Sequence, residues 1–133
     1  MEANNFVIGD MVQTPTGVTF AITKQEGEYF NVSRFYLDGK PYDKVLHRSE
    51  LKPVHITTAF FQLIEFDVPP RTMYDKQIVT DKDKLISFVL YHGHLDLDST
   101  IIHFVHNFQH AYKEKTGKNL DITRALTFSY NNP

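Results

Sequence analysis

The first part of the chain, residues 6–54, alternates short apolar runs with turn sequences. Val18, Phe20 and Ile22 occupy every second position, which is the pattern of a half-buried strand. Asp38-Gly39 separates two aromatic-rich runs and favours a hairpin. The pattern predicts five strands, at residues 6–13, 18–24, 29–36, 42–46 and 52–54, with a short helical turn at residues 47–51 before the last one.

The number and shortness of these strands predict the fold of the first part. A sheet of five short strands can avoid exposed edges by closing on itself. Residues 1–54 are therefore expected to form an SH3-like small β-barrel. Pro53 limits the last strand to an edge, because proline cannot donate a ladder hydrogen bond.

From residue 55 the apolar positions follow a different pattern. Thr57 or Thr58 can cap a helix whose apolar residues recur at helical spacing, and Pro69-Pro70 should end that helix at or before Asp67. A hairpin is expected from strands 73–80 and 85–92, which flank the turn at residues 81–84. Gly93 breaks the second strand, and residues 94–98 alternate as a third.

The clearest helix is predicted over residues 101–116, with Gly117 in the C-cap position. Its polar face carries a series of side chains that includes three histidines, and its apolar face is formed by Ile101, Phe104, Val105, Phe108, Ala111 and Tyr112. The apolar residues after it fall on even positions between 120 and 130. That pattern favours a closing strand, with a short helix as the alternative.

The expected fold class is α+β. An SH3-like small β-barrel is followed by a helix, an antiparallel β-hairpin or sheet, and a long amphipathic helix. The barrel, residues 1–54, and the C-terminal unit, residues 55–133, should pack together, either as two domains or as one continuous domain. The shared interface is expected from two apolar faces, Phe60/Phe61/Leu63/Ile64 and Ile101/Phe104/Val105/Phe108.

Composition and charge exclude several classes of function. The net charge is −2, and residues 1–54 carry 6 Lys and Arg against 7 Asp and Glu, so no strongly basic region exists to attract a polyanion. The absence of cysteine excludes disulfides, thiolate nucleophiles and Cys-ligated metals. The first residues lack a signal-peptide pattern, and no apolar run is long enough to span a membrane, so a cytoplasmic protein with no membrane association is expected.

Motifs for catalysis are weak. There is no G-x-S-x-G sequence and no glycine-rich phosphate loop. The carboxylate pairs Asp81/Asp83 and Asp96/Asp98 lie in or beside turns, where aspartate is favoured for local hydrogen bonds. The sequence therefore favours a protein that is not an enzyme and has no cofactor.

The histidines suggest metal binding as an alternative function. Five of the seven histidines lie between positions 92 and 110, at His92, His94, His103, His106 and His110. His103, His106 and His110 would form one stripe on the predicted helix, and three imidazoles can make a zinc site. A metal-binding protein or hydrolase is thus one hypothesis. The simpler interpretation is a solvated polar face on which glutamine or lysine would serve equally well.

Exposed aromatic residues suggest a binding surface. The candidates are Tyr29, Phe35, Tyr36 and Tyr42 in the barrel, and His106 and Gln109 on the helix. We expect an interaction module that binds a protein or peptide. Nucleic-acid binding is the alternative, because the opening FVIGDMVQTPTG partly resembles the Gly-Asp-x-Val start of KOW-type strands and aromatic residues on such barrels stack bases.

Two segments resemble one family. VHNFQHAYKEKTGKNL, residues 105–120, is similar to the signature helix of small uncharacterised bacterial proteins with an SH3-like or KOW-like N-terminal part, in which Val-His is followed at fixed spacing by Gln, Tyr and Thr-Gly. SELKPVHITTAFFQLIEF, residues 49–66, is similar to the junction before that family's next helix. The resemblance implies a bacterial protein of this architecture and no particular reaction.

Overall fold

The computed structural model describes residues 5–70 and 76–127 and divides them into two compact units. The first unit contains residues 5–54 together with residues 122–127, and the second contains residues 55–70 and 76–121. One boundary falls after Val54, where the change of pattern places it. The other falls before Ile122, so the end of the chain belongs with the first unit, whereas the sequence pattern groups it with the second.

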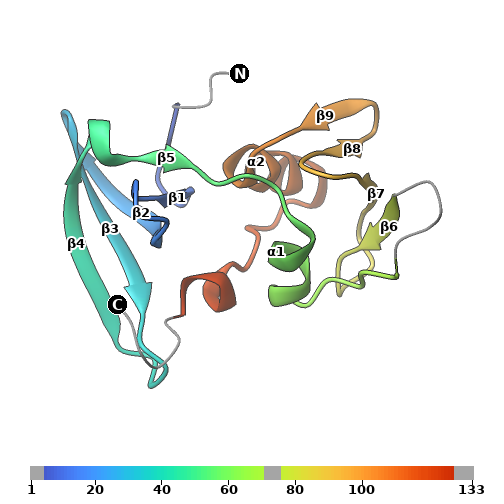
Figure 1. Cartoon of the computed structure of the whole chain (residues 1–133), viewed down its shortest axis with the longest axis horizontal. Helices are drawn as coiled ribbons and strands as arrows, with labels where there is room; N and C mark the ends of the chain where they lie inside the picture. The colour runs from blue at the N-terminus through green and yellow to red at the C-terminus, as the bar shows by residue number, and fades with distance from the viewer. Residues whose placement is uncertain (1–4, 71–75, 128–133) are drawn as a thin grey trace. The chain divides into compact units, whose positions relative to one another are not determined.

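The first unit is a five-stranded antiparallel sheet with the strand order β4-β3-β2-β1-β5 (Figure 1). A 3₁₀ turn, η1 (Arg48–Glu50), precedes the last strand. The strands are β1 (Met11–Gln13), β2 (Thr19–Glu26), β3 (Tyr29–Phe35), β4 (Pro41–His47) and β5 (Lys52–Pro53). The first strand begins at Met11, not at Phe6, because Gly9 turns the chain at φ 96° and the carboxylate of Asp10 accepts a hydrogen bond from the amide of Val7.

The expected closed barrel is not present in the part of the chain that the structure describes. β4 pairs with β3 and β5 pairs with β1, but β4 and β5 do not pair with each other. β5 has only two residues, and Pro53 has no amide to donate. The backbone amide of His47, at the end of β4, donates instead to the carboxylate of Glu50 in η1. The sheet therefore stays open between its two outer strands.

The core of the first unit lies on one side of this sheet. Alternate residues of the long strands point to it, as the pairs Phe30–Leu46 and Ile22–Val32 show. Val18 and Tyr42 are only partly buried at its margin. The buried members are Phe6, Val12, Phe20, Ile22, Phe30, Val32, Leu46 and Leu51.

The other side of the sheet is covered at one end by η2 (Thr123–Leu126), a 3₁₀ turn near the end of the chain. The hydroxyl of Thr19 donates to the carbonyl of Ala125 at 3.2 Å, and Thr127 forms a parallel bridge with Phe35. The predicted closing strand is thus a 3₁₀ turn over residues 123–126, and its positions 128–130 lie outside the described residues. The three-residue period of this turn places Ile122 and Ala125, both buried, on one side.

The second unit packs two helices against a four-stranded antiparallel sheet of order β6-β7-β8-β9. Its elements are α1 (Thr58–Leu63), β6 (Gln77–Thr80), β7 (Ser87–Leu90), β8 (Leu95–Leu97), β9 (Thr100–Ile102) and α2 (Val105–Thr116). Thr57 caps α1 as expected, since its hydroxyl accepts a hydrogen bond from the amide of Phe60. The predicted hairpin and third strand are present, although residues 73–75 of the hairpin lie outside the described part.

The start of the long helix differs from the prediction. The helix begins at Val105, because Asp98 and Ser99 adopt left-handed backbone conformations (φ 49° and 69°) and fold residues 100–102 back onto β8 as a fourth strand. Ile101, which the helical pattern places on the apolar face, is therefore an exposed strand residue. The other end agrees with the prediction, since Gly117 is left-handed (φ 74°) and its amide donates to the carbonyl of Lys113.

An aromatic cluster forms the centre of the second unit. The ring of Phe61 in α1 lies 5.0 Å from that of Phe88 in β7 and 5.1 Å from that of Phe108 in α2. The two apolar faces that the sequence assigns to an interface between the two parts thus contribute to the core of the second unit itself. Leu63 and Ile101 are the exceptions, being exposed. Within the described residues, no helix combines the length and apolar character needed to cross a membrane.

Candidate functional site

Four of the predicted binding residues lie in the first unit, on two different sides of its sheet. Tyr36 and Tyr42 lie on the core-facing side, with ring centroids 5.9 Å apart in an edge-to-face arrangement. Tyr29 and Phe35 occupy positions on the other side. Tyr29 is 54% exposed, and its ring lies 5.1 Å from that of His47. The structure therefore brings together only Tyr36 and Tyr42.

The other two predicted binding residues belong to α2. Gln109 is half-buried, whereas His106 has no exposed surface. The ring of His106 packs 6.0 Å from that of Phe104 and 6.0 Å from that of His110. Burial, and secondarily the neighbouring His110, lower the pKa of His106 to about 4. His106 is therefore a neutral core residue at pH 7 and cannot touch a partner directly in this structure.

A pocket of about 350 Å³ opens beside Tyr42 on the core-facing side of the sheet. Phe20 is buried, and its ring centroid lies 6.2 Å from that of Tyr42. The half-buried Val18 adds apolar surface, and the exposed Lys44 and Glu50 add one charge of each sign. The pocket is lined by Thr14, Pro15, Thr16, Val18, Phe20, Tyr42, Lys44 and Glu50.

Arg34 supports this pocket from within the sheet. Its guanidinium carbon lies 6.0 Å from the centroid of the Phe20 ring, which is within the range of a cation–π contact. Burial lowers the pKa of Arg34 below its usual value, but a guanidinium remains protonated in proteins. One face of Phe20 is thus already occupied by a cation, and the accessible aromatic surface of the pocket comes from Tyr42.

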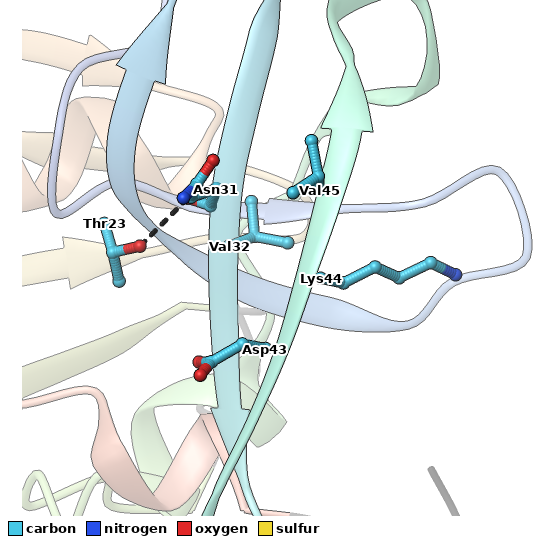
Figure 2. Close-up of a pocket in the computed structure, with 6 residues that line it drawn as sticks. All are labelled: Thr23, Asn31, Val32, Asp43, Lys44 and Val45. Atoms are coloured by element: carbon cyan, nitrogen blue, oxygen red, sulfur yellow. Dashed lines mark hydrogen bonds between the residues drawn. The ribbon is translucent and has the colours of Figure 1, made fainter.

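A second pocket, of about 510 Å³, lies across β2, β3 and β4 (Figure 2). It is formed where a bulge at Thr23 shifts the register between β2 and β3, and the Thr23 hydroxyl donates to the carbonyl of Asn31 at 3.1 Å. Asp43 and Lys44 leave β4 in opposite directions beside it. The lining residues are Thr23, Asn31, Val32, Asp43, Lys44 and Val45.

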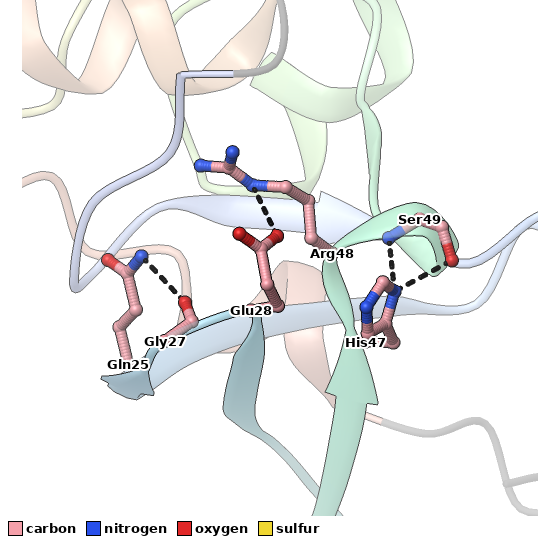
Figure 3. Close-up of polar contacts among 6 residues, drawn as sticks. All are labelled: Gln25, Gly27, Glu28, His47, Arg48 and Ser49. Carbon is pink, nitrogen blue, oxygen red and sulfur yellow. Dashed lines mark hydrogen bonds and ion pairs between the residues drawn. The ribbon is translucent and has the colours of Figure 1, made fainter.

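Both pockets include Lys44, and the ion pairs around them leave this cation available. Lys24 pairs with Glu26 at 2.6 Å, and the resulting hydrogen bond raises the pKa of Lys24. Arg48 lies 3.7 Å from the carboxylate of Glu28, next to the bonds between His47 and Ser49 (Figure 3). None of the acidic side chains in the described ranges forms an ion pair with Lys44.

The five histidines proposed as metal ligands do not converge. The rings of His94 and His103 lie 5.7 Å apart, and those of His106 and His110 form a separate pair. His103 precedes α2, so the expected helical stripe of three histidines does not form. His92 is exposed in the turn after β7. Within residues 5–70 and 76–127, no group of three or more His, Asp and Glu side chains is placed so that it could hold a metal ion.

Of the residues that line the pocket beside Tyr42, only Tyr42 itself is among the binding residues predicted from the sequence. The missed residues include Pro15, Lys44 and Glu50. Two features of the sequence could have indicated Pro15 and Lys44. Thr14-Pro15-Thr16-Gly17 is a turn whose side chains cannot all be buried. Lys44 lies two positions from Tyr42 and is therefore on the same side of its strand.

Comparisons of the chain with protein-family models, curated proteins and solved structures found no match. The geometry of the first unit is accordingly the basis for a functional assignment.

Proposed function

We propose that the first unit is a non-catalytic peptide-binding module, and that the peptide binds in the pocket beside Tyr42. The observation that carries the proposal is the pocket itself, whose apolar surface from Pro15, Val18 and Tyr42 is combined with two exposed charges, Lys44 and Glu50. Concave sites that combine an apolar lining with a few polar groups are the usual form of ligand sites. A peptide can supply both kinds of contact along one short segment.

An SH3-like arrangement of the first unit is part of this proposal. The strand order β4-β3-β2-β1-β5, with a 3₁₀ turn before β5, supports it. Aromatic-lined grooves on small β-domains of this kind bind extended peptides, because an extended chain loses little conformational freedom on binding. The resemblance of residues 49–66 and 105–120 to small bacterial proteins is consistent with this architecture and names no ligand.

The charge of the first unit favours a peptide over a nucleic acid. Residues 1–54 contain 6 basic and 7 acidic residues. Near the pocket, Lys44 is accompanied by the carboxylate of Glu50. Binding of a nucleic acid depends on neutralising several phosphates with basic side chains, which such a balanced surface does not provide.

A pair of tyrosine variants tests the proposal. Peptides selected from a random display library on the full chain are labelled, and their affinity is measured by fluorescence anisotropy. Tyr42→Ala should weaken binding by at least about tenfold, since a tyrosine at the centre of an interface often contributes 2 kcal/mol or more. Tyr29→Ala is the matched control, because Tyr29 is exposed on the other side of the same sheet and should leave the affinity unchanged.

Two results would contradict the proposal. The first is a set of selected peptides whose affinity does not depend on Tyr42. The second is the absence of any peptide ligand together with binding of a single-stranded oligonucleotide whose affinity falls steeply as salt is added. That second result would favour the nucleic-acid alternative, because the release of counterions from phosphates produces such a dependence.

A further inference from the structure

The backbone of β4 forms hydrogen bonds with the rest of the sheet along one of its two edges. Among the described strands, β4 pairs with β3 alone. The amide of Tyr36 donates to the carbonyl of Lys40, and the amide of Arg48 donates to the carbonyl of Glu28. These bonds lie at the two ends of the β3–β4 ladder, and they show that the residue pairs that exchange hydrogen bonds have even residue numbers. The backbone groups at odd positions of β4, which include Asp43 and Val45, therefore point away from β3.

The two ends of this edge are already closed. Pro41 has no amide hydrogen, and the amide of His47 donates to the Glu50 carboxylate at 2.9 Å. The outward amides of Asp43 and Val45 lie between these two positions. A segment of about five residues, 41–45, is thus open to another strand.

Side chains within residues 41–45 line a different pocket on each side of the sheet. Tyr42 and Lys44 line the pocket of about 350 Å³ on the core-facing side, and Asp43 and Val45 line the pocket of about 510 Å³ across the sheet. A strand projects successive side chains to opposite sides. An added strand would therefore direct alternate side chains toward the two pockets. Its side chains on the core-facing side would lie next to Tyr42 and Lys44.

We propose that the peptide binds by adding an antiparallel strand to the edge of β4 at residues 41–45, with an acidic residue beside Lys44 and an apolar residue beside Tyr42. This inference rests on the peptide-binding function proposed above and adds its mode and its sequence preference. The acidic residue follows from Lys44, which forms no ion pair with the other described residues. Because an antiparallel peptide runs from Lys44 toward Tyr42, its pattern is Asp/Glu-x-apolar.

The proposal also accounts for the chemistry of the edge. A lysine on an edge strand hinders unspecific pairing between copies of a protein. Lys44 has that effect against most strands, but it attracts one that carries a carboxylate at the matching position. The same residue then both protects the edge and selects the ligand.

Replacement of one outward amide tests the mode of binding. Val45→Pro removes an amide hydrogen that points away from β3, and proline is tolerated at such positions of edge strands. We expect the affinity of the selected peptides to fall more than tenfold. Val45→Thr is the comparison variant, because it keeps the amide and the β-branched shape at the same position, and its loss of affinity should be much smaller than that of Val45→Pro. Amide NMR spectra of both variants confirm that the sheet is retained.

Peptides modified on the backbone give a second measurement that does not depend on folding of a variant. N-methylation of the middle residue of the Asp/Glu-x-apolar pattern removes the amide expected to donate to the carbonyl of Asp43, so binding should be lost. N-methylation of the acidic or the apolar residue affects an amide that points away from β4, and most of the affinity should remain. Lys44→Glu should reverse the preference, weakening acidic peptides and strengthening those with lysine at that position.

The outcomes separate this inference from the proposed function. Loss of binding in Tyr42→Ala together with unchanged binding in Val45→Pro, or with equal effects of N-methylation at all three positions, would overturn strand addition while leaving the peptide site intact. Selected peptides that share no acidic position would overturn the role of Lys44. A library that yields no peptide ligand contradicts the proposed function, and this inference with it.

Discussion

His103 and His106 show how two identical side chains acquire different environments. Their spacing in the sequence predicts that both lie on one polar stripe of a helix. In the structure His103 lies before α2 and is exposed, whereas His106 lies in its first turn and is completely buried. A neutral imidazole is also a flat ring, and its packing near Phe104 allows it to occupy a core position that a permanently charged side chain could not.

Burial of His106 predicts a loss of stability in mild acid. Its folded-state pKa of about 4 lies below the ordinary value of 6.5, so the unfolded chain binds a proton more readily than the folded one. The free energy of unfolding should therefore fall as the pH drops below about 6.5, by up to about 3 kcal/mol once the pH reaches about 4. Urea unfolding of the full chain at several pH values between 7 and 4 measures this dependence.

The contribution of His106 is isolated by comparing variants. His106→Gln carries no titrating group and should show a flatter pH dependence, even where its stability at pH 7 is lower. His92→Gln, at an exposed position, should keep the slope of the original chain. An equal slope in all three proteins would mean that His106 is not the group responsible.

Asp81 connects two elements of the second unit. The sequence pairs it with Asp83 as a turn carboxylate, but Asp81 is only 1% exposed whereas Asp83 is exposed to solvent. One oxygen of Asp81 accepts hydrogen bonds from the amides of Leu85 and Ile86, at 2.7 and 2.9 Å. The other accepts from the hydroxyl of Tyr112 in α2 at 3.1 Å. The carboxylate therefore shapes the β6–β7 hairpin and joins it to the helix.

Removing the partners of this carboxylate should destabilise the protein. Tyr112→Phe deletes one hydrogen bond to a buried charge and should lower the free energy of unfolding by about 1.5–3 kcal/mol. Asp81→Ala should have a larger effect, since three donors lose their acceptor. Tyr91→Phe and Asp83→Ala are the matched controls, each with an expected change below about 0.5 kcal/mol. Urea unfolding at pH 7 compares the four variants, and similar losses for Asp81 and Asp83 would contradict this role.

At the scale of the whole molecule, the first unit is made from two separate stretches of chain. Residues 5–54 form the sheet, and residues 122–127 return to cover one side of it. Ile122, Ala125 and Leu126 are all buried there. A sheet formed only by the N-terminal stretch would expose the surface that these residues cover.

Shortening the chain tests this arrangement. A chain that ends at Asp121 should lose at least about 2 kcal/mol of stability, because it removes the buried side chains of Ile122 and Leu126. Hydrogen exchange should become faster at the amides of β2 and β3, the strands that contact η2. A chain that ends at Thr127 is the control. Unchanged exchange in β2 and β3 of the shorter chain would show that the tail does not support the sheet.

Much of the fold could be predicted because its signals are local. The alternation of Val18, Phe20 and Ile22, the turn at Asp38-Gly39, the cap at Thr57 and the left-handed position at Gly117 each depend on a few neighbouring residues. These signals located nearly every strand and both helices. In the candidate site, the sequence proposes Tyr42 as a binding residue from its aromatic character alone, and that role stays a prediction.

The remaining features depend on contacts between residues far apart in the chain. The sequence by itself determined the spacing of apolar residues in each segment, and hence whether most segments form a strand or a helix. Only the tertiary structure decided that residues 100–102 become a strand, because the turn at Asp98 and Ser99 brings them beside β8, with which their backbone pairs. It alone decided that the tail covers the first sheet and that the turn at Pro15 lies beside Tyr42 and Lys44 in one pocket, because the approach of different strands and turns is set by strand register and packing and not by the local pattern.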